Sequence, residues 1–274
     1  MKKMGTVLLG FAALIGLTAC GSGDENSSDA SAEDKVIKVA AQAPPMTDVV
    51  EVAAEEAEED GWDIEMVQVN DNVAYNDMVS SEEADASFAQ HKPFMEDYNE
   101  ENDTNLVDIQ PIYDAKVGFY SEDYDEIDEI PDGTTVAIPN DVSNEGRALA
   151  ILEEQGLIKL KEGAGKNGTL KDVEENPKDF EWMSVDLLNL AEAYSEPDVS
   201  LVYDYPTYIE KIGLKPTDAL FLEDDVDSRF SIQLVAREDN KDSEKIKALE
   251  KAMTSDRVRS FLEDEHSDTL IPSF

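Results

Sequence analysis

The sequence is poor in the residues that build metal and redox sites. It has one cysteine, Cys20, and two histidines among 274 residues. A single cysteine excludes an intramolecular disulfide, a multi-cysteine zinc site and an iron–sulfur cluster built from this chain alone. Two histidines are too few for a histidine-rich metal cage. We therefore expect neither a metal nor a cofactor.

Positive charge is scarce as well. The chain carries 22 Lys and Arg against 64 Asp and Glu, which gives a net charge of -42. A surface of this sign repels a phosphate backbone. The composition therefore excludes nucleic-acid binding.

The signature loops of several enzyme classes are also missing. No Gly-x-Gly-x-x-Gly and no phosphate-binding loop occurs, so nucleotide chemistry has no support in the sequence. There is no Gly-x-Ser-x-Gly turn, and His91 and His266 offer poor material for a hydrolytic triad. We predict that the protein is not an enzyme.

What is present is the composition of a folded protein, with 41% apolar and 31% charged residues in a length that suits one large or two ordinary domains. Strand-like and helix-like patterns alternate along the chain, which predicts an α/β fold. The expected strands are 36–40, 64–69, 84–89, 106–112, 115–120, 134–139, 200–203 and 231–237. Five helices are expected. The first is capped by Thr47 or Asp48, the second is a short helix before residue 84, and the third runs from the Asn-Asp turn after 139 through Leu152. The last two are 243–253 and 257–261.

The first twenty residues have the layout of a secretory signal. Two lysines precede an apolar run from Val7 to Leu17, which is too short for a stable membrane span. The run ends in Leu-Thr-Ala-Cys-Gly at Cys20, which resembles a bacterial lipobox. We predict a signal peptide over 1–19, acylation such as palmitate on Cys20, and a location on the outer face of the cell membrane. Because the sole cysteine stands at the cleavage position, an incidental cysteine in a cytoplasmic protein is a poor explanation.

Residues 20–35 have no apolar periodicity and predict a lipidated, flexible tether, with folding beginning near Val36. Removal of 1–19 takes away two lysines and no acid, so the net charge changes from -42 to -44. An exported surface this acidic indicates a high-salt, halophilic habitat. The simpler interpretation is that the acidic runs are solvated helix faces. The two interpretations are compatible with each other.

A specific run at 138–147 reads Ile-Pro-Asn-Asp-Val-Ser-Asn-Glu-Gly-Arg. Three shorter segments accompany it: Gln-His-Lys-Pro-Phe at 90–94, Asp-Val-Glu-Glu-Asn-Pro-Lys at 172–178 and Arg-Glu-Asp at 237–239. In this order, the segments resemble the NlpA family, the methionine-binding lipoproteins of ABC importers. The resemblance extends from about Val36 to the C-terminal helix.

This resemblance implies a two-lobed, periplasmic-binding-protein-like fold of type II, with the ligand in the cleft between the lobes. It places lobe 1 at 36–118 and 226–274, and lobe 2 at 119–225. It also implies a substrate-binding lipoprotein for amino-acid uptake, with methionine as the first candidate, that works with an ABC permease and an ATPase. Clefts of this kind close on their ligand by hinge motion.

Asn144 and Arg147 suit the carboxylate of an amino acid. They lie three residues apart at the start of an expected helix, where the N-terminal end favours an anion. The planar guanidinium can hold a carboxylate through two parallel hydrogen bonds. The plainer alternative is a surface arginine paired with one of the many acids.

His91 and Phe94 are the candidates for the opposite wall. His91 would be a hydrogen-bonding group, and Phe94 would be an apolar face for a thioether or alkyl chain. Without the resemblance, a lone histidine is more often structural.

Other pocket positions depart from the family. Asn72 stands where the family has Tyr, Ala89 replaces the Phe before Gln-His, and Asp204-Tyr205 align with an Ile-Asn pair whose amide helps to hold the head group. Asp204 could pair with a ligand ammonium, and Tyr205 could fill vacated space. The alternatives are a pocket for a larger or more polar amino acid, a pocket for a short peptide, and a vestigial cleft in a surface lipoprotein.

Overall fold

The computed structural model describes residues 35–267 and 269–274. The predicted signal peptide, the lipid-anchor residue Cys20 and all of the predicted tether except Lys35 therefore lie outside the described residues. No helix in the described ranges is long and apolar enough to cross a membrane.

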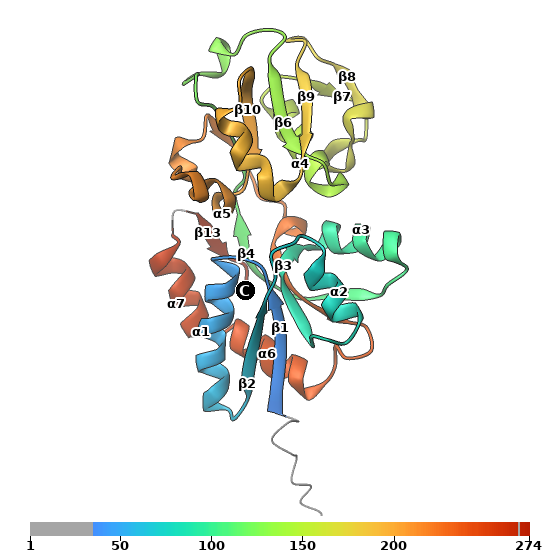
Figure 1. Cartoon of the computed structure of the whole chain (residues 1–274), viewed down its shortest axis with the longest axis vertical. Coiled ribbons are helices and arrows are strands. Elements are labelled where there is room, and N and C mark those ends of the chain that lie inside the picture. Colours follow the sequence, from blue (N-terminus) through green and yellow to red (C-terminus); the bar gives the residue numbers. More distant parts are fainter. Residues whose placement is uncertain (1–34, 268) are drawn as a thin grey trace, which may run out of the picture.

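The protein is elongated and consists of two halves, each built on its own sheet (Figure 1). The larger half has a six-stranded sheet in the order β13-β4-β12-β3-β1-β2. Its strands are β1 (Val36–Ala41), β2 (Asp63–Gln68), β3 (Ala86–His91), β4 (Leu106–Ala115), β12 (Ile232–Arg237) and β13 (Leu270–Pro272). Its helices are α1 (Met46–Glu59), α2 (Ala74–Ser80), α3 (Lys92–Asn102), α6 (Glu244–Met253) and α7 (Asp256–Glu265).

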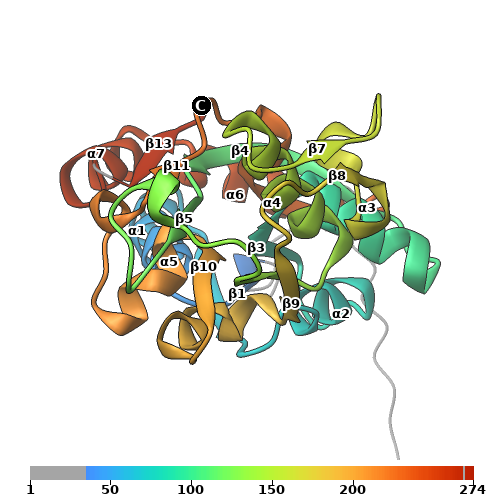
Figure 2. The same ribbon diagram turned by 90° about the horizontal axis from the view of Figure 1, so that it is seen from above.

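In this sheet, β1 pairs in parallel with β2 and β3, whereas β12 is antiparallel to β3 and β4. The last part of the chain therefore returns to the half in which the first part folds. Seen from above, the smaller half lies over the larger one (Figure 2).

The smaller half has a five-stranded sheet in the order β11-β5-β10-β6-β9. Its strands are β5 (Gly118–Tyr120), β6 (Thr135–Pro139), β9 (Glu181–Val185), β10 (Val199–Asp204) and β11 (Phe221–Leu222), beside a separate pair, β7 (Lys159–Leu160) and β8 (Val173–Glu175). Its α-helices are α4 (Val142–Glu154) and α5 (Pro206–Ile209). Short 3-10 helices are η2 (Ile127–Glu129), η3 (Gly165–Asn167), η4 (Leu170–Asp172), η5 (Leu187–Ser195), η6 (Glu210–Ile212), η7 (Pro216–Asp218) and, at the return to the larger sheet, η8 (Ser228–Phe230).

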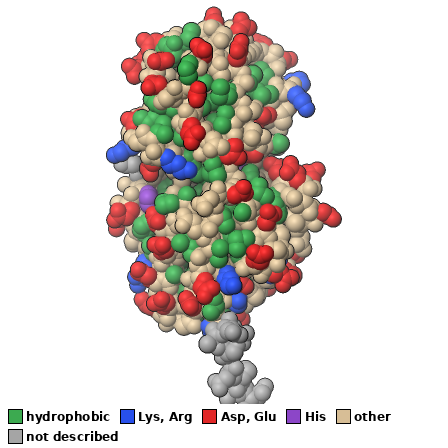
Figure 3. All heavy atoms as spheres, viewed as in Figure 1, with side chains coloured by type: hydrophobic (Ala, Val, Ile, Leu, Met, Phe, Trp, Pro, Cys, Tyr) green, Lys and Arg blue, Asp and Glu red, His purple; other side chains and the backbone are tan. Residues whose placement is uncertain are grey.

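Local sequence explains how the elements form. Every residue of β3 and β10 is buried, as expected for central strands covered on both faces. In α1, the residues Val49, Val50, Ala53 and Ala57 recur at helical spacing and are buried. Acidic side chains occupy the solvent face of such helices, and Figure 3 shows Asp and Glu spread over the surface with few Lys and Arg between them.

The predicted α/β class is confirmed, and strands lie at or near each predicted range. Two details were wrong. Helix α1 begins at Met46 after Pro45 with no side-chain cap, so neither Thr47 nor Asp48 has that role. The boundary between the two strands predicted at 106–112 and 115–120 was misplaced, because β4 continues to Ala115 and β5 starts only at Gly118.

The chain passes between the two sheets twice, at 116–117 and at 223–231. We propose these segments as the crossings between the lobes. The predicted limit at 118 falls on the first residue of β5, and the predicted limit at 225 falls inside the second segment. A Cβ on Gly118 would lie 2.7 Å from Leu222 Cδ2 and 2.8 Å from the carbonyl oxygen of Phe221, so the close pairing of β5 with β11 requires glycine there.

Candidate ligand-binding site

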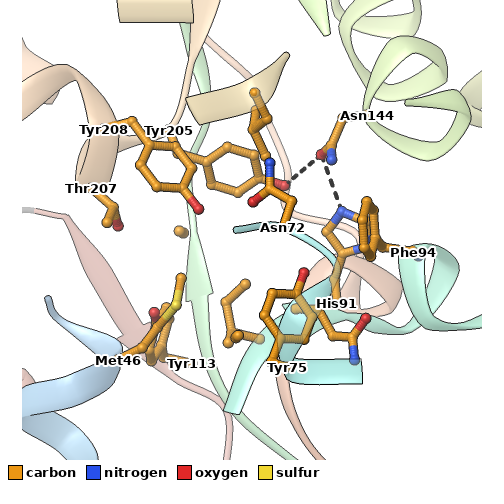
Figure 4. Close-up of a pocket in the computed structure, with 15 residues that line it drawn as sticks. Met46, Asn72, Tyr75, His91, Phe94, Tyr113, Asn144, Tyr205, Thr207 and Tyr208 are labelled. Atoms are coloured by element: carbon orange, nitrogen blue, oxygen red, sulfur yellow. Dashed lines mark hydrogen bonds between the residues drawn. The ribbon is translucent and has the colours of Figure 1, made fainter. Parts of the chain in front are cut away.

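A cavity lies where the two halves meet. Both halves contribute to its wall, and no Asp, Glu, Lys or Arg is among the described residues that line it. Figure 4 shows several of these side chains converging on the same space. The lining residues are Met46, Asn72, Tyr75, Ala89, Gln90, His91, Phe94, Tyr113, Ala115 and Ile232 from the larger half, and Asn144, Leu187, Tyr205, Thr207 and Tyr208 from the smaller half.

Five of the seven ligand-binding residues expected from the sequence line this cavity: Asn72, His91, Phe94, Asn144 and Tyr205. The other two, Arg147 and Asp204, are fully buried beside it without forming its wall.

His91 joins the two halves. It is the last residue of β3 and the N-cap of α3, where its Nδ1 accepts the N–H of Phe94 at 3.2 Å. Because Nδ1 accepts, the ring proton is on Nε2, which lies 3.1 Å from Asn144 Oδ1 and donates to it. Burial lowers the pKa of His91 to about 3 against the opposing effect of the hydrogen bond to Asn144. The ring is therefore neutral at ordinary pH.

Asn144 is held rigidly at the start of α4. The side chain of Asp141, the N-cap residue, accepts the backbone N–H of Asn144 at 2.9 Å and the side-chain Nδ2 at 3.0 Å. The Asn144 Oδ1 is thereby turned toward His91 and toward Tyr205, whose hydroxyl donates to it at 2.9 Å. Both hydrogen bonds are drawn in Figure 4. Asn144 is thus the polar centre of the contact between the halves.

The glycine of the Asn-Glu-Gly-Arg run has a packing role. A Cβ on Gly146 would lie 2.4 Å from the backbone oxygen of Lys166 and 2.9 Å from that of Gly168. Since neither backbone oxygen can move easily, only glycine lets α4 approach the η3 turn this closely. The run therefore combines a cap, a polar centre and a close helix contact.

Arg147 has a carboxylate partner within the chain. Its side chain is 0% exposed, and its Nε donates to Glu223 Oε2 at 3.2 Å while Nη2 donates to Glu223 Oε1. Nη2 also donates to the backbone oxygen of Ala115 at 3.1 Å, and Nη1 donates to the Tyr205 hydroxyl at 2.9 Å. The sequence expectation of an arginine open to a ligand carboxylate differs from this arrangement, in which Glu223 already supplies the carboxylate.

Asp204 is placed away from the cavity wall. Its Oδ1 accepts the N–H of Tyr205 at 2.8 Å, and its Oδ2 is buried with no hydrogen-bond partner in the described part of the chain. Burial raises the pKa of this carboxyl well above its usual range. The position does not support the expected pairing of Asp204 with a ligand ammonium.

Several residues of the site were missed at the level of sequence. Tyr75, Tyr113 and Tyr208 supply aromatic wall, and Glu223 completes the surroundings of Arg147. Tyr208 also bridges the halves, because its hydroxyl donates to Gln42 Oε1 at 2.8 Å. The only local signal was the clustering of three tyrosines at 203–208 beside a strand end. Nothing local marks Glu223 among the many acids.

A hollow with an acidic wall adjoins the cavity. This hollow shares Asn72 and Phe94 with the cavity and is also lined by Asp97, Glu101, Asp141 and Asp186. Burial raises the pKa of Asp97 and of Asp141. Negative charge beside the cavity disfavours the approach of an anion.

Comparison with known proteins gives a consistent result. The family model described as NlpA lipoprotein matches residues 37–274. The D-methionine-binding lipoprotein MetQ of Salmonella typhimurium is 36% identical over 251 residues, which is 90% of each chain. A solved YaeC-family lipoprotein from Enterococcus faecalis is 50% identical, with a TM-score of 0.79 over 88% of this chain and 100% of its own. A nutrient-binding protein from Burkholderia cenocepacia, solved bound to methionine, is 33% identical, with a TM-score of 0.82 over 87% of this chain and 100% of its own. The resemblance noted in the sequence and the two-lobed α/β fold that it implied are confirmed.

Proposed function

The chain belongs to the NlpA lipoprotein family, and we propose that it is the substrate-binding lipoprotein of an ABC importer for amino-acid uptake, with methionine or a related compound as its ligand. The observation that carries the proposal is the cavity between two sheets, to which both halves contribute wall residues. A site shared by two lobes can be opened and closed by their relative motion. The names of the relatives supply the candidate ligand.

The contacts across the cavity suggest how a ligand would be retained. His91 and Asn144 join the halves on one side, and Tyr208 and Gln42 join them on another. A ligand between these bridges would add apolar contacts with Met46 and Phe94, which suit a thioether. Closure of the two halves would then exclude water from the ligand. Opening of the halves at the permease would release the ligand.

The anchor is part of the same proposal. Lipid on Cys20 would hold the protein at the extracytoplasmic face of the membrane, beside the permease and ATPase of its importer. Replacement of Cys20 by Ser removes the thiol that would carry the lipid, so the protein should move from the detergent phase to the aqueous phase on partitioning. Equal partitioning of the variant and the wild type would contradict the anchor.

The ligand assignment is tested by releasing bound small molecules from the purified protein for mass spectrometry, followed by calorimetry with methionine and other amino acids. We expect a bound compound of amino-acid size. A protein that carries no small molecule and binds none of the compounds tested would overturn the proposed function.

A further inference from the structure

We propose that Tyr205 competes with the ligand for one place beside the cavity. Its hydroxyl bridges Arg147 and Asn144 as the head group of an amino acid would, so the side chain turns away when an amino acid binds. The inference rests on the proposed function and adds to it a residue that lowers the affinity. It concerns the head group of the ligand, whatever side chain the ligand carries.

The hydroxyl of Tyr205 combines the two hydrogen-bonding roles of an amino-acid head group. Its oxygen accepts from Arg147 Nη1 at 2.9 Å, as a carboxylate oxygen would. Its proton is donated to Asn144 Oδ1, also at 2.9 Å, as an ammonium proton would be. Figure 4 shows the second of these bonds. A zwitterion carries an acceptor and a donor on neighbouring groups, so one amino acid can replace the hydroxyl at both partners.

Arg147 keeps one nitrogen for this exchange. Glu223 accepts from Nε and Nη2, and the backbone oxygen of Ala115 accepts from Nη2 at 3.1 Å. Within the described residues, Nη1 donates only to Tyr205. A ligand carboxylate can therefore bind Arg147 through Nη1 while the buried pair with Glu223 stays intact, which avoids the cost of separating that pair.

Tyr205 also stands between the cavity and the arginine. It lines the cavity, whereas Arg147 is fully buried and does not line it. The central carbon of the guanidinium lies 5.4 Å from the centre of the Tyr205 ring. An amino acid in the cavity therefore reaches Nη1 only after the phenol has moved.

The backbone at Tyr205 is fixed, so the movement is confined to the side chain. The backbone N–H donates to Asp204 Oδ1 at 2.8 Å, and Pro206, the next residue, restricts the backbone at the start of α5. The ring has edge-on contacts with Tyr203 and Tyr208, whose ring centres lie 6.0 and 6.1 Å away. Binding therefore includes the loss of both hydroxyl bonds and a turn of the ring, and the free energy of this rearrangement lowers the observed affinity.

The test compares Tyr205→Phe with the wild type by calorimetry, with methionine as the probe. The variant keeps the ring and lacks the hydroxyl, so Arg147 Nη1 and Asn144 Oδ1 lose their phenol partner. Methionine should bind the variant about tenfold or more tightly than the wild type, because no hydrogen bond to a charged group has to be broken first. Tyr194→Phe is the matched control. Its hydroxyl donates to the Ser121 oxygen at 2.9 Å and Tyr194 does not line the cavity, so the affinity should stay at the wild-type value.

A second probe assigns the gain to the head group. 3-(Methylthio)propylamine has the side chain and the amine of methionine but no carboxylate, so it can replace the hydroxyl at Asn144 and not at Arg147. Its gain in affinity on Tyr205→Phe should be clearly smaller than the gain of methionine. An equal gain for the two compounds would overturn the proposal that the hydroxyl stands in for a carboxylate.

Tyr205→Leu replaces Tyr205→Phe if the latter does not fold. It removes the same hydroxyl and shortens the side chain, so the affinity for methionine should change in the same direction. Equal or weaker binding of methionine by the variant that folds would overturn the inference, and the proposed function would stand because the wild type still binds. If neither the wild type nor the variant bound methionine or any other amino acid tested, both would fail.

Discussion

Two arginines of this protein bind carboxylates in opposite surroundings. Arg147 meets one glutamate, Glu223, where the two halves touch, and both side chains are almost completely buried. Arg257 on α7 meets three glutamates of α1, Glu55, Glu56 and Glu59, with its own side chain 41% exposed. The surface arginine has more carboxylate partners, whereas the buried one is also held by hydrogen bonds to Tyr205 and to the backbone oxygen of Ala115.

The difference shows that the number of ion pairs is a poor guide to their importance. Water and salt screen the surface cluster, so each of its pairs contributes little. Both members of the buried pair are desolvated in the folded protein, and their mutual attraction offsets the free energy of desolvation. Removal of one member therefore leaves the other charged, buried and without a partner. The buried pair should therefore be sensitive to mutation and the surface cluster tolerant of it.

The largest effect is expected from Glu223→Ala. It leaves Arg147 buried without a counter-ion, and the free energy of unfolding should fall by about 3–5 kcal/mol. Urea unfolding of this variant beside Glu55→Ala, which removes a surface partner of Arg257, measures the contrast directly. If the two variants lost equal stability, the distinction between the buried and exposed pairs would be wrong.

Acidification tests the same interior through His91. Its pKa is about 3 in the folded protein against an ordinary value of 6.5, so below the ordinary value the unfolded chain takes up a proton that the folded protein refuses. Stability is therefore lost as pH falls from that value toward the folded pKa. By about pH 5, the wild type should have lost about 2 kcal/mol more than His91→Gln.

The comparison with His91→Gln is needed because buried carboxyls such as Asp204, whose pKa is raised, favour the folded state as pH falls and so act in the opposite direction. Urea unfolding of both proteins across this pH range gives the difference. Parallel stability curves would show that His91 is not held neutral by the fold.

Salt should act mainly on the surface. With a net charge of -42, most long-range interactions are repulsive, and screening lowers their energy. The melting temperature should rise by several degrees between dilute buffer and molar NaCl. A melting temperature that stays constant or falls would remove the argument for a high-salt habitat.

The smallest effect is expected from Arg257→Gln. It releases three exposed glutamates that water can solvate, so any loss of melting temperature in dilute buffer should be slight and should vanish in molar NaCl. A loss that persisted in salt would mean that this surface cluster behaves like the buried pair.

Much of the fold was predictable because its central strands are defined locally. β1, β6 and β10 are short apolar runs, and burial on both faces is what such runs require. β9 and α3 were missed because few of their residues are buried, so their apolar pattern is weak. β9 is an edge strand with no fully buried residue, and only Met95 and Tyr98 are buried in α3. Tertiary contacts, rather than local pattern, determine these two elements.

In the candidate site, too, some residues could be predicted from local sequence and others depend on tertiary contacts. The run at 138–147 carried enough local information to indicate the family, and five of the seven expected residues line the cavity. The aromatic wall of Tyr75, Tyr113 and Tyr208 could not be read from the sequence, because it comes from three elements far apart in the chain.

By itself, the sequence determined the α/β class, the acidic surface, and the presence of a helix start bearing Asn144 and Arg147, since each depends on composition or on neighbours within a few residues. Only the tertiary structure decided which of the 64 acids meets Arg147. Glu223 lies 76 residues away, and the pairing exists because the segments between the sheets bring it against α4. Short-range patterns specify elements, whereas the partner of a buried charge depends on how those elements pack, because only packing excludes the water that would otherwise solvate it.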